Sequence, residues 1–146
     1  MPLRKFEISD LDICIDLYLD FANAMERGDD DGWTEHAVAE RLRGILESPV
    51  FSGWVLEENN VTVGFVLGVS LYLRMGRGFD VLELFCAAGR DVRATAASML
   101  KQLAPILKDE GFVRVGVLSN ELWTADFFSS HDFLENKDVR LFEFPL

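Results

Sequence analysis

Hydrophobic residues recur at helical spacing in several parts of the chain, with polar residues between them. Four segments have this pattern: Leu11 to Met25, Thr34 to Leu46, Ala94 to Glu110, and a short one that begins at Ser119 or Asn120 and runs toward Ser130. Apolar residues three and four positions apart share one face of a helix, so each segment predicts an amphipathic helix. Thr34 is a favoured N-cap residue, and Gly111 is a typical C-terminal stop.

Other segments are rich in β-branched, aromatic and aliphatic residues and predict strands. They are Leu3 to Ile8, Phe51 to Glu57, Val61 to Leu73, Phe79 to Cys86, Phe112 to Leu118 and Val139 to Phe144. The second, third and fourth of these segments are joined by short, turn-like segments, which favours an antiparallel meander. Apolar residues occupy both parities of Val61 to Leu73, as is typical of a sheet covered on both faces. We therefore expect the order β-α-α-β-β-β-α-β-α-β, in one α/β domain (residues 1–146) with a mixed sheet.

Composition and charge narrow the range of partners. The 146 residues are 49% hydrophobic and carry a formal net charge of −11. An acidic chain is a poor match for nucleic acid, because binding to phosphates needs clustered cations. No apolar run is long enough to span a bilayer, and the N-terminus does not have the pattern of a signal peptide. We expect a soluble, cytoplasmic protein without a nucleic-acid or membrane partner.

Several signatures of common enzyme classes are missing from the sequence. The two histidines, His36 and His131, have no second ligand at zinc spacing, and no nucleophile or phosphate-loop motif is present. Cys14 and Cys86 lie in apolar contexts, where free thiols usually pack as small hydrophobic residues. The sequence therefore predicts no metal site, hydrolase triad or disulfide framework.

Four short stretches agree in order and spacing with those of a known family. They are Leu82-Glu83-Leu84-Phe85, Ser98-Met99-Leu100-Lys101-Gln102-Leu103, Glu110-Gly111-Phe112, and Phe127-Phe128-Ser129-Ser130-His131-Asp132-Phe133. Together with the element order, they make the chain resemble the GCN5-related N-acetyltransferase (GNAT) superfamily over essentially its whole length. The resemblance implies a mostly antiparallel central sheet with helices on both faces, and acetyl-CoA as the co-substrate.

The segment before the third helix would bind the pyrophosphate of acetyl-CoA, because the first N–H groups of a helix are unpaired donors at its positive end. The resemblance places the family's loop positions at Asp91, Ala94 and Ala96. Ala96 lies within the family pattern, and Ala94 is compatible with binding if its backbone is helical rather than at positive φ. Asp91 departs most from the family pattern, because a carboxylate repels phosphate. Arg90 or Arg93 is therefore expected to supply the positive charge.

The resemblance also implies catalytic roles. Glu83 matches a strand glutamate that deprotonates the substrate amine, directly or through water, although an outward-facing carboxylate is the alternative. Phe128 stands where many members have a tyrosine that protonates the thiolate, so Tyr72 or a water molecule is expected to substitute. Asn120 resembles an asparagine that contacts the cofactor arm, or is an ordinary N-cap. The expected cofactor-binding residues are Phe85, Cys86, Ala87, Arg90, Arg93, Ala94, Thr95, Ala96, Ala97, Asn120 and Phe128.

The first two helices and the loop between them would line the substrate pocket. Tyr18, Trp33 and the acidic run Asp29 to Asp31 lie there. Aromatic rings and carboxylates suit an amine or a polyamine, through cation–π contacts and charge attraction. For Trp33, a purely structural role beneath the loop is the alternative.

The resulting hypothesis is an acetyl-CoA-dependent N-acetyltransferase that transfers an acetyl group to a small amine by direct attack, without a metal. Asp91, Ala94 and Phe128 favour a second hypothesis, a binding or regulatory module of the same fold that has lost turnover. A third is a structural domain that forms a homodimer through a strand edge.

Overall fold

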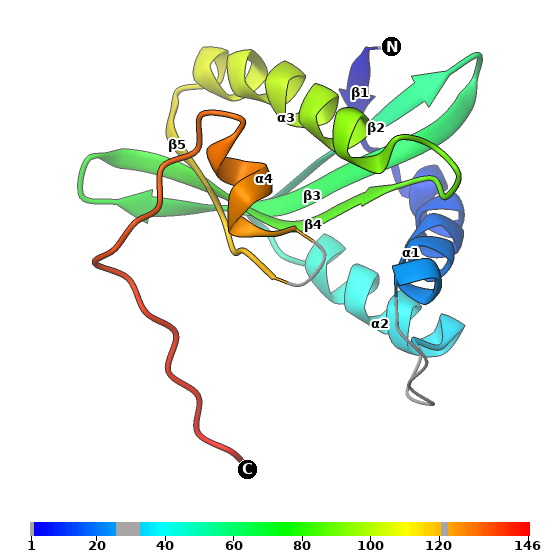
Figure 1. Ribbon diagram of the computed structural model, residues 1–146, viewed down its shortest axis with the longest axis horizontal. Helices are drawn as coiled ribbons and strands as arrows, with labels where there is room; N and C mark the ends of the chain where they lie inside the picture. Colours follow the sequence, from blue (N-terminus) through cyan, green and yellow to red (C-terminus); the bar gives the residue numbers. More distant parts are fainter. Residues whose placement is uncertain (1, 26–32, 121–122) are drawn as a thin grey trace.

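A five-stranded sheet runs through the middle of the molecule, with helices on both of its faces (Figure 1). The computed structural model describes residues 2–25, 33–120 and 123–146. In chain order the elements are β1 (Leu3–Lys5), a 3-10 helix η1 (Ile8–Asp10), α1 (Leu11–Met25), α2 (Glu35–Leu46), β2 (Phe51–Glu58), β3 (Val61–Leu73), β4 (Gly76–Cys86), α3 (Val92–Asp109), β5 (Phe112–Val117) and α4 (Ala125–Ser129). None of the helices in the described ranges is long and apolar enough to cross a membrane.

The strands lie in the order β1-β2-β3-β4-β5, which is also their order along the chain. The first four pair antiparallel, and β5 pairs parallel to β4 after the crossover through α3. Asn59 and Asn60 join β2 to β3 with φ of 51° and 63°, the left-handed conformations that a tight two-residue hairpin requires. The predicted mixed, mostly antiparallel sheet is thus confirmed.

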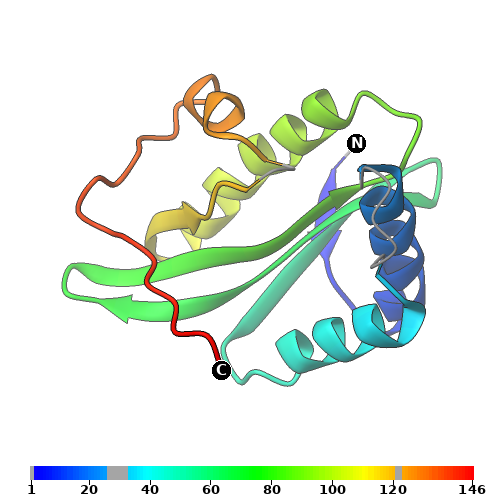
Figure 2. The same ribbon diagram turned by 60° about the horizontal axis from the view of Figure 1, so that its bottom comes forward.

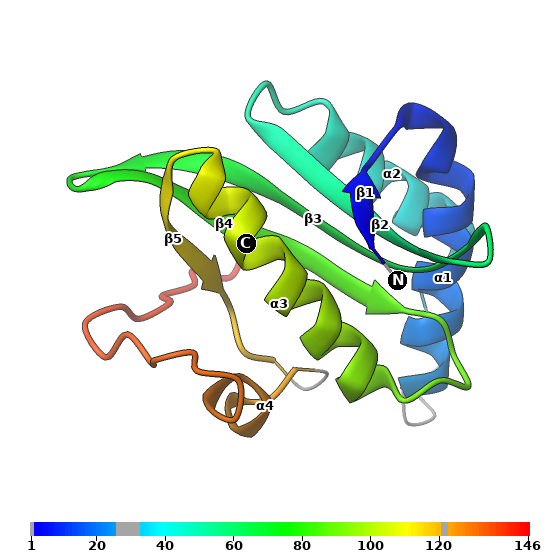
Figure 3. The ribbon, with the colours of Figure 1, turned by 90° about the horizontal axis from the view of Figure 1, so that it is seen from above.

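Two layers of helix cover the sheet. Helices α1 and α2 lie on one face, and α3 and α4 lie on the other (Figures 2 and 3). The buried core includes Phe21 of α1, Phe65 of β3 and Met99 of α3, each at most 2% exposed. Burial of apolar side chains against both faces explains why Val61–Leu73 is apolar at both parities.

Two expectations for the last third of the chain are wrong. Residues 139–144 form no strand, and within the described residues β5 pairs with β4 alone. The aromatic rings of Phe142 and Phe144 are each 87% exposed, so the β-forming composition of this segment meets no partner strand to pack on. The short helix begins at Ala125 after Thr124, whereas the side chain of Asn120 accepts the Trp123 N–H at 2.8 Å.

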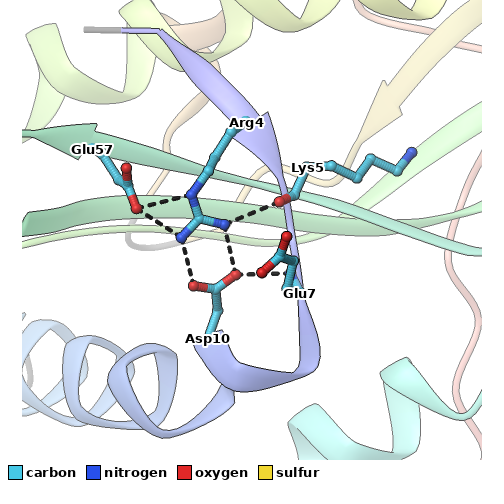
Figure 4. A network of polar contacts seen from close by, with 5 residues as sticks. All are labelled: Arg4, Lys5, Glu7, Asp10 and Glu57. Atoms are coloured by element: carbon cyan, nitrogen blue, oxygen red, sulfur yellow. Dashed lines mark hydrogen bonds and ion pairs between the residues drawn. The ribbon is translucent and has the colours of Figure 1, made fainter. Parts of the chain in front are cut away.

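A network of ion pairs anchors the start of α1 to the edge of the sheet (Figure 4). Arg4 of β1 donates to both carboxylate oxygens of Asp10, at 2.9 and 2.7 Å, and its Nε donates to Glu57 of β2 at 2.8 Å. The Glu7 N–H donates to the same carboxylate at 2.8 Å. Asp10 is only 6% exposed, and its hydrogen bond with Arg4 lowers its pKa. Paired in this way, a buried charge defines where α1 begins.

A β-bulge in β4 controls which side chains face which layer of helices. Leu67 of β3 pairs with Glu83, but Gly68 pairs with Val81, so Leu82 is an extra residue in β4. Side chains alternate between faces along a strand, and one extra residue reverses the alternation. Val81 therefore lies on the α3 face, whereas Glu83 lies on the face covered by α1 and α2.

Gly68 makes this bulge sterically feasible. A Cβ at this position would collide with the Asp80 carbonyl oxygen and lie 2.6 Å from Phe79 Cζ, both on the partner strand. Replacing the hydrogen with a methyl group would push β3 and β4 apart at the bulge.

We expect Gly68→Ala to lower the free energy of unfolding by roughly 3 kcal/mol, because backbone and a buried ring must both shift. Gly44→Ala is the matched control: nothing lies within 4 Å of a Cβ there, and alanine favours the helix, so stability should rise by about 0.5–1 kcal/mol. Urea unfolding followed by circular dichroism measures both. An unchanged midpoint for Gly68→Ala would contradict the tight packing at the bulge.

Candidate functional site

An ion pair with a buried carboxylate joins α2 to β4. The carboxylate of Glu83, 4% exposed, receives a hydrogen bond and an ion pair from the guanidinium of Arg41. Arg41 itself is 44% exposed, so its side chain reaches from the surface of α2 inward to the sheet. The charged side chain of Arg41 therefore lies between Glu83 and solvent.

A group of aromatic rings lies beside this ion pair. The ring of Tyr18 of α1 stacks on Phe85 of β4 at a centroid distance of 4.1 Å, and Trp33 contacts the Tyr18 ring edge-on at 5.4 Å. Arg41 also donates a hydrogen bond to the Tyr18 hydroxyl oxygen. Tyr18 is 4% exposed and Trp33 is 37% exposed, so the rings form a wall that leads from the surface to the buried carboxylate.

The surroundings of Glu83 shift its protonation. Burial raises the pKa of Glu83 to about 6, although the charge and the hydrogen bond of Arg41 act in the opposite direction. Burial near Glu83 also raises the pKa of Tyr18 to about 12, so the phenol stays protonated at neutral pH. A carboxylate that titrates near 6 is mostly ionised at pH 7 and is a suitable proton acceptor there.

Strand β4 loses its neighbour immediately beside this carboxylate. Pairing with β5 ends at Val81 and Val117, although β4 continues to Cys86. Backbone groups alternate sides along a strand, and Ala87 donates to β3 (Ala87 N to Val63 O, 2.8 Å), so the N–H and C=O of Leu84 and Cys86 point toward the side that β5 has left.

The indole of Trp123 lies at this open edge. Its Nε1 donates to the Leu84 carbonyl oxygen at 2.9 Å, and the ring is 5% exposed. It stacks against Phe21 of α1 at 5.7 Å and contacts Phe127 of α4 at 5.0 Å. Trp123 therefore bridges the two helical layers at the point where β4 and β5 separate.

The loop after β4 leads to the N-terminus of α3. Asp91 is the N-cap, and its side chain accepts the Ala94 N–H at 3.1 Å. Gly89 has φ of 83°, a left-handed conformation that turns the chain toward the helix. The guanidinium of Arg90 is paired with Glu58, and that of Arg93 lies over the Phe127 ring at 5.4 Å.

Comparisons with known proteins place this architecture. No protein-family model matches the chain, and no curated protein matches its sequence. A predicted acetyltransferase from Clostridium acetobutylicum, solved with acetyl-CoA, matches with a TM-score of 0.70 and 13% identity, covering 97% of this chain and 94% of that one. A GNAT family acetyltransferase from Staphylococcus aureus matches with a TM-score of 0.70 and 13% identity over 100% of both chains. The fold is that of the GNAT acetyltransferases.

A third acetyltransferase of this fold was solved with an aminoglycoside. It is an aminoglycoside acetyltransferase from an uncultured soil metagenomic sample, in complex with sisomicin. Its TM-score is 0.72 at 18% identity, and the match covers 99% of this chain and 95% of that one.

Within the acetyltransferase fold, the structure brings together three of the residues expected near the acceptor. Tyr18, Trp33 and Glu83 converge, but Arg41 joins them and was not anticipated from the sequence. Arg41 lies three positions after Val38, at the edge of the buried stripe of α2. This helical spacing is the sequence feature from which its approach to the sheet could have been predicted. The run Asp29 to Asp31 lies outside the described residues.

The expected proton donor is not near the site. Tyr72 is 86% exposed and pairs with Arg77 near the tip of the β3–β4 hairpin. It lies five residues along β3 from Leu67, the partner of Glu83, and at about 3.3 Å per residue this is roughly 16 Å. The sequence placed Tyr72 on the right neighbouring strand but could not place it along that strand.

The expected cofactor-binding residues are distributed differently from the sequence-based assignment. Helix α3 begins at Val92, two residues earlier than expected, so the N–H of Thr95 already bonds to Asp91 O at 2.9 Å. Ala96 and Ala97 follow within the helical ladder, and their N–H groups are directed to helix carbonyls. The unpaired donors at this helix start are those of Val92 and Arg93. Ala94 lies inside the helix and has a helical backbone, which is the condition expected from the sequence for phosphate binding at this position.

The remaining expected residues serve mainly in packing. The ring of Phe128 is 7% exposed and packs against Phe133 at 5.5 Å. Cys86 and Cys14 are both buried, and burial raises the pKa of each thiol to about 12, so neither is a nucleophile at neutral pH. Across the described ranges, no cluster of three or more His, Cys, Asp or Glu side chains is arranged to hold a metal ion.

The raised pKa of Glu83 predicts a pH-dependent stability. The unfolded chain ionises this group near pH 4.5 and the folded chain near 6, so its contribution is fully present below pH 4.5 and is lost as the pH rises through 6. Relative to Glu83→Gln, the wild type should therefore lose stability between about pH 4.5 and 6 and stay level above. Denaturant unfolding of both proteins from pH 4 to 8 measures this difference. A difference that does not vary with pH would mean that the fold leaves the ionisation of Glu83 unchanged.

Proposed function

We propose that this chain is an acetyl-CoA-dependent N-acetyltransferase that transfers the acetyl group directly to an amino group of a small molecule. The observation that carries the proposal is the buried carboxylate of Glu83, located where β4 and β5 separate. A carboxylate in that place is a proton acceptor beside an unpaired strand edge. The fold shared with acetyltransferases supports the same reaction class.

In this reaction Glu83 is the general base. It accepts one proton from the ammonium group of the acceptor, directly or through water, and the free amine attacks the thioester carbonyl carbon. The new N–C bond forms, the C–S bond breaks, and sulfur leaves with the bonding electrons. The nitrogen then loses a second proton, which the CoA thiolate takes up, and Glu83 returns its proton to solvent. Thiols are far more acidic than alcohols, so the CoA thiolate leaves with little acid assistance and the remote position of Tyr72 is no obstacle.

Two parts of the chain suit acetyl-CoA. The main-chain groups of Leu84 and Cys86 point toward the side that β5 has left and suit an extended, amide-containing arm, which would compete with Trp123 for the Leu84 carbonyl. The start of α3 offers the N–H groups of Val92 and Arg93 to phosphate oxygens, and the side chains of Arg90 and Arg93 add positive charge. Acetyl-CoA supplies the activated acetyl group, and these groups would orient it toward Glu83.

Specific contacts favour a second candidate, a binding module of this fold without turnover. Trp123 already occupies the Leu84 carbonyl, Glu58 neutralises Arg90, and Asp91 places a carboxylate at the start of α3. Each of these contacts competes with acetyl-CoA for a group that the co-substrate would use, or lies beside such a group.

The decisive experiment combines binding with turnover. Titration calorimetry with acetyl-CoA and with CoA measures binding, and release of free thiol across a panel of amines measures turnover. The panel includes aminoglycosides, amino acids and polyamines. We expect Glu83→Gln to lower kcat by about 100-fold or more, because a general base typically contributes 10²–10⁴-fold, and to leave affinity for acetyl-CoA within about twofold.

Asp80→Asn is the matched control for Glu83→Gln. Asp80 lies on the same strand, but its side chain is 37% exposed and pairs with Arg114 at 3.1 Å, away from the candidate site. Its substitution should leave kcat unchanged. Absence of heat with acetyl-CoA would reject both candidates, whereas binding without thiol release would select the binding module. Equal activity of Glu83→Gln and wild type would remove Glu83 as the base.

A separate variant tests the loop before α3. Asparagine at position 91 can still cap the helix through its side-chain oxygen, but it carries no charge. Asp91→Asn should therefore leave the free energy of unfolding nearly unchanged and tighten acetyl-CoA binding several-fold. Asp91→Ala removes the charge and also the cap, and should lose about 1 kcal/mol of stability. If Asp91→Asn binds acetyl-CoA no better than the wild type, the pyrophosphate does not lie at this helix start.

A further inference from the structure

The contact between Arg41 and Glu83 restricts which amines can reach the base. The carboxylate is 4% exposed, and the guanidinium that covers it is 44% exposed. An acceptor can therefore contact Glu83 only after Arg41 has moved aside or has changed partners. Arg41 is long and flexible and belongs to the surface of α2, so it can move without unfolding the helix.

A simple ammonium ion is poorly suited to make this exchange. It would take the carboxylate from Arg41 and then lie beside a guanidinium that has lost its partner. Two like charges close together in a partly buried site repel each other, and a half-buried charge without a partner is costly. The same objection applies to a polyamine, whose further cations increase the repulsion.

A zwitterion avoids both penalties. Its ammonium group pairs with Glu83 and its carboxylate pairs with Arg41, so two ion pairs replace one and every charge remains compensated. Arginine is the side chain best suited to bind a carboxylate through two parallel hydrogen bonds. Because Arg41 and Glu83 are in direct contact, the opposite charges of the ligand must also be adjacent.

We propose that the acceptor is an α-amino acid, with its carboxylate held by Arg41 and its amino group held by Glu83. The inference rests on the proposed N-acetyltransferase function and specifies its substrate class. Tyr18, Phe85 and Trp33 form the nearest wall, so the side chain of the amino acid is apolar or aromatic. Arg41 is then a substrate-binding residue that also aims the amino group, while Glu83 takes the ammonium proton as described above.

Three matched ligands test the proposal on the wild-type protein. L-phenylalanine has both charges, phenethylamine lacks the carboxylate, and 3-phenylpropionate lacks the amino group. Calorimetric titration without acetyl-CoA should give at least tenfold tighter binding of L-phenylalanine than of either analogue. With acetyl-CoA, kcat/KM for L-phenylalanine should exceed that for phenethylamine by about 30-fold or more, since a charge-assisted pair is being lost.

Variants of α2 separate substrate recognition from structural support. Arg41→Gln should lower kcat/KM for L-phenylalanine by roughly 30- to 100-fold and leave that for phenethylamine equal or higher. Arg41→Lys should restore part of the loss, because it keeps the charge but not the two-pronged geometry. Arg43→Gln, an exposed arginine of the same helix, is the control and should change neither value. A merely structural Arg41 would lower activity toward both ligands equally.

The outcomes distinguish this inference from the proposed function. Acetylation of phenethylamine as efficient as that of L-phenylalanine would overturn the amino-acid proposal and retain the acetyltransferase. Tight binding of L-phenylalanine without any thiol release would support the zwitterion site and reject the enzyme. If L-phenylalanine binds no more tightly than phenethylamine or 3-phenylpropionate, the proposal fails. This test uses the wild-type protein, so it holds even if Arg41→Gln does not fold.

Discussion

The ion pair between Glu83 and Arg41 is the interaction on which the site depends. A carboxylate in the middle of a sheet is costly unless a partner compensates its charge, and loss of one partner leaves the other buried and unpaired. The pair therefore ties α2 to β4, and the hydrogen bond from Arg41 to Tyr18 extends the connection to α1. At the N-terminal end of α1, Arg4 and Asp10 hold the helix start against the sheet edge. Ion pairs thus position α2 and the start of α1, and ring stacking holds Tyr18 against the sheet.

The surroundings of strand β4 change within three residues. Pairing with β5 ends at Val81, the bulge falls at Leu82, and Glu83, directly after the bulge, faces α1 and α2. Bulges often occur next to active sites, where they redirect a side chain or end strand pairing. Here one bulge accompanies both effects, so the base and the open strand edge lie side by side.

The two halves of the proposed site differ in how ready they are for a ligand. On the acceptor side, Glu83 and Arg41 are paired with each other, and a zwitterion can replace each partner in kind. On the acetyl-CoA side, Trp123 occupies the Leu84 carbonyl, and Asp91 places a carboxylate beside the helix N–H groups that the co-substrate would use. Any affinity for acetyl-CoA is therefore reduced by the contacts it must displace.

Local patterns in the sequence were sufficient for most of the architecture. Helical spacing, the Thr34 cap, the Asn59-Asn60 turn and the long apolar strand Val61–Leu73 depend on neighbouring residues, and all appear in the structure. Local patterns did not determine which face of the sheet Glu83 lies on. Simple alternation along β4 places Glu83 on the same face as Val81. The bulge opposite Gly68 reverses that order, and the contact with Arg41, 42 positions away, requires two distant elements to meet. Residues 139–144 illustrate the same limit: their composition favours a strand, but a strand needs a neighbour that only tertiary structure supplies.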